Sequence, residues 1–67
     1  MKTILDKTNG VGLGALRVRV LEHPDAPGEY IISLERGGLP ESVCESLAEL
    51  RFMANCLAAA ADRIENK

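Results

Sequence analysis

Two arginines in the first half of the chain stand two residues apart, at a spacing suited to binding phosphate or acidic groups. Arg17 and Arg19 are separated only by Val18, and in an extended strand their side chains lie on one face, about 7 Å apart. Such a pair on an exposed β-ribbon can contact a nucleic-acid backbone. The competing interpretation is pairing with Glu35 across a neighbouring strand, which we favour because no further basic or aromatic residues surround the arginines.

Glutamates recur every four residues further along the chain, at Glu41, Glu45 and Glu49. On one helix face, neighbouring like charges repel by roughly a few tenths of a kcal/mol per pair, and the two arginines of another subunit would relieve this repulsion. A solvated helix face is the simpler interpretation. Phe52 lies beside the row, where it either anchors a partner or packs on the sheet, and the sequence leaves both interpretations open.

Histidine and cysteine, which often serve in catalysis or metal binding, are few in this chain. His23 and Asp25 flank a proline, so a turn explains their spacing. Cys44 and Cys56 would lie about 18 Å apart along one helix, too far for an internal disulfide. The single histidine completes no zinc pattern. We therefore expect no catalytic residues, no metal site and no cofactor.

The composition is that of one small domain that needs a further source of stability. The chain has 67 residues, a net charge of −2 and only 3% aromatic residues, so its core must be aliphatic. A single core in a chain below about 70–80 residues seldom supplies more than about 3–5 kcal/mol, which favours self-association. The slightly acidic charge disfavours general nucleic-acid binding. No stretch has the apolar length of a signal peptide or membrane span, so we expect a cytoplasmic location.

Alternating apolar residues predict an antiparallel β-meander over residues 2–36. Strands are expected at 15–22 and 29–36, and at 2–8 if the meander has three strands. Asn9-Gly10 predicts a two-residue type I′ turn, the prolines of the 23–28 segment predict a loop, and Gly37-Gly38 ends the last strand. Leu21 and Ile31 fall on the same outer face as the arginines and could form a small apolar partner patch.

The apolar period changes after the meander, which predicts one long helix over residues 40–66. Pro40 suits a first helical turn, whereas Ser42-x-x-Glu45 fits a capping box, so the sequence allows two starts. The apolar positions follow an unbroken heptad spacing: Val43, Leu47, Leu50, Ala54, Leu57, Ala61 and Ile64.

This helix is longer than the strands that should cover it. From residue 41 to 66 it would extend about 39 Å, against about 27 Å for an eight-residue strand, so part of its apolar stripe needs another cover. A two-fold dimer that pairs equivalent helices is the simplest solution. The competing one is a monomer with a frayed helix end, since alanine favours helix intrinsically. The expected interface residues are Leu50, Met53, Ala54, Leu57, Ala61 and Ile64.

The expected fold is therefore α+β: a small antiparallel meander followed by one long C-terminal amphipathic helix, dimerising through that helix. We expect a non-enzymatic, homo-oligomeric binding or regulatory protein that acts on another protein, as inhibitors and accessory factors of phages and mobile elements do. The candidate partner-binding residues are Arg17, Arg19, Leu21, Ile31, Glu45, Glu49 and Phe52.

Two other functions are compatible with the sequence, and neither involves a membrane. The first is a nucleic-acid-binding regulator that uses the Arg17 and Arg19 ribbon. The second is a protein that sequesters a small ligand, such as a nucleotide, in a pocket between subunits near the glycine-rich segment and the His23 loop.

Overall fold

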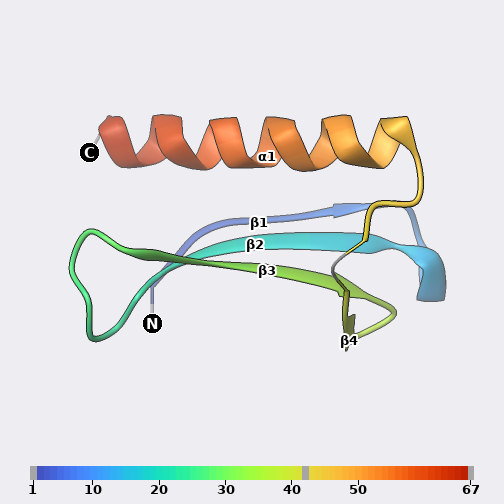
Figure 1. Cartoon of the computed structure of the whole chain (residues 1–67), viewed down its shortest axis with the longest axis horizontal. Helices are drawn as coiled ribbons and strands as arrows, with labels where there is room; N and C mark the ends of the chain where they lie inside the picture. Colours follow the sequence, from blue (N-terminus) through green and yellow to red (C-terminus); the bar gives the residue numbers. More distant parts are fainter. Residues whose placement is uncertain (1, 42, 67) are drawn as a thin grey trace.

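The computed structural model describes residues 2–41 and 43–66 and shows a sheet covered on one face by a helix (Figure 1). Its strands are antiparallel and lie in chain order, β1-β2-β3-β4, and the helix follows them. The expected α+β fold, a meander followed by one helix, is confirmed. The elements are β1 (Thr3–Asn9), η1 (Gly12–Gly14, a 3₁₀ turn), β2 (Leu16–Glu22), β3 (Tyr30–Arg36), β4 (Leu39–Pro40) and α1 (Leu47–Glu65).

The three predicted strands are all present, close to their expected bounds. β2 and β3 pair along their whole lengths, from Leu16–Arg36 to Glu22–Tyr30, because their alternating residues give the sheet one apolar and one polar face. β1 pairs with β2 through a register shift between Thr3 and Leu5. The intervening Ile4 packs against the core next to the buried Leu5, so the shift turns two successive apolar residues towards the core.

The predicted two-residue turn at Asn9-Gly10 is wrong. A two-residue turn with two positive φ angles occurs instead between β3 and β4. Asn9 pairs with Leu16, so a longer connection containing η1 joins β1 to β2. Among the described residues, only glycines have a positive φ, which excludes the two successive positive angles that Asn9-Gly10 would need. Gly37 and Gly38 have φ of 62° and 81°. They form the two-residue turn into β4, which the sequence prediction lacked.

The helix begins at Leu47 rather than near residue 40, so the predicted start is wrong. Pro40 belongs to β4, where it pairs with Glu35, and Ser42 of the predicted capping box lies outside the described residues. The N-cap is Ser46, whose hydroxyl accepts a hydrogen bond from the Glu49 backbone at 3.1 Å. With 19 residues, α1 is about 28 Å long. The seven-residue strands extend about 23 Å, so α1 exceeds them by only about 5 Å rather than by the wide margin predicted from the sequence.

The core lies between α1 and the first half of the sheet. Its buried residues come from β1, β2 and the helix: Leu5, Leu16, Val18, Val20, Cys56 and Ala60. The small side chains of Cys56 and Ala60 let the helix backbone approach the sheet closely, and α1 accordingly packs over β1 and β2. The helix-facing side of β3 is left largely without cover.

Candidate functional site

An apolar groove runs between β3 and the beginning of α1. It has a volume of about 640 Å³, and its lining residues are Leu34, Val43, Cys44, Glu45, Ser46, Leu47, Leu50 and Met53. Leu34 supplies the floor from β3, the linker before the helix forms one end, and the first turns of α1 form the wall. A volume of this size falls within the range of ligand sites, although the groove is a shallow surface feature lined mainly by apolar side chains.

The apolar floor continues along β3 beyond the groove. Tyr30 and Ile32 point to the same side of the sheet as Leu34, because Ile32 pairs with the buried Val20 and Leu34 with the buried Val18. Ile32 is nevertheless 55% exposed, since no described element lies over this part of the sheet. α1 thus covers the core-facing side of β1 and β2 but leaves that of β3 largely exposed.

The predicted heptad stripe of α1 points largely away from its own sheet. Leu47 is 65% exposed and Leu50 49% exposed, and Ala54 and Ala61 are also exposed. Leu57 and Ile64 are half-buried, and Leu57 packs against the core. The sheet instead meets the neighbouring face of the helix, with Cys56 and Ala60 at its centre. α1 is therefore apolar on two adjacent faces, of which its own chain buries one.

Phe52 and Met53 lie at opposite borders of the sheet-facing side of α1. Both are half-buried and pack against the core. For Phe52, the structure accordingly places the side chain in intramolecular packing, which was one of the two interpretations that the sequence left open. Met53 lies on the groove side, where it lines the wall beside Leu50. Phe52 and Met53 thus mark the two borders of the buried face of the helix.

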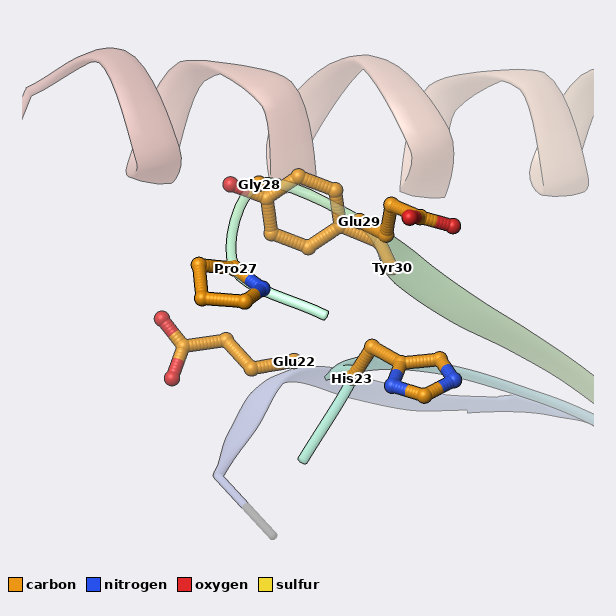
Figure 2. A pocket seen from close by; sticks show the side chains of 6 residues that line it. All are labelled: Glu22, His23, Pro27, Gly28, Glu29 and Tyr30. Atoms are coloured by element: carbon orange, nitrogen blue, oxygen red, sulfur yellow. The ribbon is translucent and has the colours of Figure 1, made fainter. Parts of the chain in front are cut away.

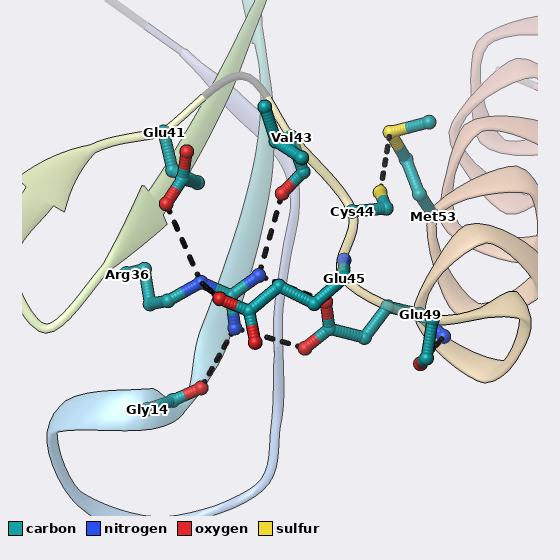
Figure 3. Close-up of polar contacts among 9 residues, drawn as sticks. Gly14, Arg36, Glu41, Val43, Cys44, Glu45, Glu49 and Met53 are labelled. Carbon is teal, nitrogen blue, oxygen red and sulfur yellow. Dashed lines mark hydrogen bonds and ion pairs between the residues drawn. The ribbon is translucent and has the colours of Figure 1, made fainter.

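Arg36 fixes the groove wall to the sheet (Figure 3). Its guanidinium donates to both carboxylate oxygens of Glu49 at 2.8 Å and to the Gly14 carbonyl at 2.9 Å. It also lies within 3.5 Å of a Glu41 carboxylate oxygen and 3.7 Å of one from Glu45. One arginine side chain, only 12% exposed, thereby ties β3 to the β1–β2 connection, the linker and the first turn of α1.

The contact between Arg36 and Glu49 favours the charged forms of both side chains. Hydrogen bonds from Arg36, and secondarily from the Glu45 backbone, lower the pKa of Glu49 from 4.5 to about 2. The same contact with Glu49 raises the pKa of Arg36 above its usual range. The predicted row of glutamates on one helix face is wrong, because Glu41 and Glu45 precede α1 and only Glu49 lies on it. The three carboxylates are instead gathered around Arg36 of the same chain.

Sequence reasoning missed Arg36, although a signal was present. Arg36 has the same parity as Leu34 and Ile32 along β3, so alternation places its side chain on the apolar side of the sheet. A charged residue at such a position needs a partner. The three glutamates that follow it are the nearest acidic residues in the chain sequence on its C-terminal side.

Arg17 and Arg19 are paired on the outer face of the sheet. Arg17 donates two hydrogen bonds to Asp6, at 2.9 and 2.6 Å, and Arg19 lies 2.9 Å from Glu35. The hydrogen bond from Arg17 lowers the pKa of Asp6 below its ordinary value. The favoured interpretation of the sequence, cross-strand pairing with Glu35, describes Arg19 well, whereas Asp6 was not foreseen as the main partner of Arg17.

The apolar pair on this outer face adjoins the ionic cluster. Leu21 and Ile31 are direct partners across β2 and β3, and both are half-buried. Two arginines and two carboxylates balance each other nearby, so the centre of the outer face carries no excess positive charge to attract a phosphate backbone.

The β2–β3 loop encloses a second, polar cavity of about 320 Å³ (Figure 2). Its lining residues are Glu22, His23, Pro27, Gly28, Glu29 and Tyr30. His23 Nδ1 accepts a hydrogen bond from the Asp25 backbone at 3.1 Å, which confirms that a turn explains the spacing of these two residues. The two carboxylates make this cavity a poor site for the phosphates of a nucleotide. The glycine-rich connection with η1 lies at the opposite end of the sheet (Figure 1).

The cysteines occupy different environments. Cys56 is buried in the core, and burial raises the pKa of its thiol. Cys44 is half-buried in the linker, where its Sγ lies 3.9 Å from the Met53 sulfur (Figure 3). Within residues 2–41 and 43–66, no three His, Cys, Asp or Glu side chains are grouped closely enough to hold a metal ion.

No family model, curated protein or solved structure matches this chain. In the part of the chain that the structure describes, no helix combines the length and apolarity needed to cross a membrane.

Proposed function

We propose that this chain is a non-enzymatic cytoplasmic binding protein that works as a homodimer and acts through protein–protein contacts. One observation carries the proposal. The exposed helix-facing side of β3, the apolar groove and the outward stripe of α1 form one continuous apolar surface that the chain's own elements leave uncovered. A continuous apolar surface rimmed by polar residues is typical of an interaction site.

The total surface supports the same proposal. The chain exposes 4573 Å², whereas a compact folded monomer of 7.2 kDa is expected to expose about 4,100 Å². This is roughly one tenth more surface than its mass requires. Each partner in a standard protein–protein interface buries about 800 Å², so one such interface would more than remove the excess.

Dimerisation through the groove would leave the outer sheet faces of both copies available. Leu21 and Ile31 would then lie on two symmetric surfaces, each beside a balanced cluster of charges. We place the contact with a further protein, as an inhibitor or accessory factor would need, on this outer face. The pairing of Arg17 with Asp6 and of Arg19 with Glu35 removes the main support for the nucleic-acid alternative.

The proposal is tested by placing one charge inside the apolar surface and one outside it. Leu50→Glu alters the groove and stripe, while Leu13→Glu alters a leucine of η1 that is 84% exposed and does not line the groove. Light scattering of the wild type and of Leu13→Glu should give twice 7.2 kDa, and Leu50→Glu should give the monomer mass. Equal masses for all three proteins would overturn the proposal.

A further inference from the structure

The outward stripe of α1 contains leucines and alanines in an order that distinguishes two ways of pairing helices. From its beginning to its end, the stripe reads Leu47, Leu50, Ala54, Leu57, Ala61 and Ile64. The intervals between these positions are the same when read from either end. Two copies can therefore align in the same direction or in opposite directions with every stripe residue facing another stripe residue.

Alignment in the same direction matches the side chains poorly. Each alanine, Ala54 or Ala61, would face its own copy, and each leucine would face a leucine. Layers of two alanines leave gaps between helices whose separation is set by layers of two leucines. Such gaps forfeit dispersion contacts and destabilise a packed interface.

Alignment in opposite directions pairs large residues with small ones. Leu50 of one copy then faces Ala61 of the other, and Ala54 faces Leu57. Because each alanine meets a leucine, these layers have nearly constant volume, which is the arrangement that fills a helix–helix interface without voids. Leu47 faces Ile64 at the two ends.

The charges beside the stripe favour the same alignment. Arg51 and Glu65 are exposed, and they are two heptads apart in the sequence, so they lie on the same flank of the helix. In an antiparallel pair, equivalent flanks meet. Arg51 would then lie about 7.5 Å along the axis from Glu65 of the other copy, within the combined reach of the two side chains.

We propose that two copies of this chain pair through α1 in an antiparallel, two-fold arrangement in which leucines face alanines. This inference rests on the proposed homodimer and adds its direction and register. The occupant of the exposed stripe is a second copy of the chain, because the stripe is complementary to itself in volume and its flank is complementary to itself in charge. The partner helix also covers the adjoining groove, since Leu50 belongs to both surfaces.

Charge complementation between variants tests the direction of pairing. In an antiparallel dimer of one Leu50→Glu copy with one Ala61→Lys copy, the two new charges face each other and the second contact between the copies keeps its native leucine and alanine. In a parallel dimer, the complementary mixture is instead Leu50→Glu with Leu50→Lys. The altered residues are exposed in the monomer, and circular dichroism of each variant checks that the fold is retained.

The readouts are native mass spectrometry and light scattering of each variant alone and of the equimolar mixtures. We expect each variant alone to dimerise at least tenfold more weakly than the wild type, and the Leu50→Glu with Ala61→Lys mixture to recover a mixed dimer. Recovery only with the Leu50→Glu and Leu50→Lys mixture would overturn the antiparallel alignment while the homodimer stands. A wild-type dimer with recovery in neither mixture would also overturn it. A monomeric wild type would overturn the homodimer itself.

Discussion

At the scale of single residues, Arg36 fastens the beginning of α1 to the end of β3. It is the charged end of an apolar strand face, and it binds Glu49 through two hydrogen bonds of 2.8 Å. The sequence revealed the glutamates but not their partner, because the partner depends on where the helix begins and how the linker turns. By contrast, the contact of Arg19 with Glu35 was predictable, since alternation places both on the outer face of adjacent strands, where Arg19 reaches Glu35 diagonally across the register.

The Arg36–Glu49 contact should give the protein an acid-sensitive component of stability. The pKa of Glu49 falls from 4.5 to about 2 on folding. A depressed folded pKa stabilises the protein above the unfolded value and loses that contribution as the pH falls from about 4.5 towards 2. Urea unfolding between pH 7 and pH 2 should therefore show a steeper loss of stability in the wild type than in Glu49→Gln.

The matched control for this titration is Glu45→Gln. Glu45 is 68% exposed and lies 3.7 Å from Arg36, so its removal should leave the wild-type slope nearly unchanged. Some acid dependence should survive in every variant, because the pKa of Asp6 is also lowered by Arg17. Parallel pH profiles for Glu49→Gln and the wild type would contradict the role assigned to Arg36.

At the scale of elements, the strands were predictable and their connections were not. Alternation over residues 15–22 and 29–36 identifies β2 and β3, because each strand has one mainly apolar and one mainly polar side. The connections depend on backbone angles. Asn9-Gly10 resembles a tight turn in sequence, yet Gly37-Gly38 adopts it, and β4 follows from that turn. The helix start was misplaced because Pro40 and the glutamates imitate an N-terminus.

The Gly37 turn should tolerate substitution less well than its neighbour. A Cβ at Gly37 would lie 2.7 Å from the Leu13 carbonyl oxygen, whereas a Cβ at Gly38 would meet nothing within 4 Å. Both positions have positive φ, so alanine is strained at each. We expect Gly37→Ala to cost about 2–3 kcal/mol and Gly38→Ala about 1 kcal/mol, measured by urea unfolding. Equal costs would show that η1 does not press against this turn.

The true helix start is tested at Ser46. Its hydroxyl caps the Glu49 backbone, so Ser46→Ala should reduce the free energy of unfolding by about 0.5–2 kcal/mol. Ser46→Asp should restore most of the loss, because aspartate caps equally well. If Ser46→Ala unfolds at the wild-type denaturant concentration, the helix does not begin where the structure places it.

At the scale of the whole molecule, the uncovered apolar surface arises from the width of the sheet more than from the length of the helix. A helix over residues 41–66 would be about 39 Å long, but α1 is shorter because Pro40 lies in β4 and the helix begins only at Leu47. α1 spans its sheet in length yet covers only β1 and β2. The uncovered surface is consequently a long apolar corner between β3 and the outward stripe of α1. The heptad residues that sequence analysis selected do lie along it.

Sedimentation equilibrium of the wild-type chain, from low to high micromolar concentration, tests directly whether a second copy covers this apolar corner. We expect a mass that rises with concentration to twice 7.2 kDa and stays there. A folded species that remains at 7.2 kDa across the whole range would contradict this expectation.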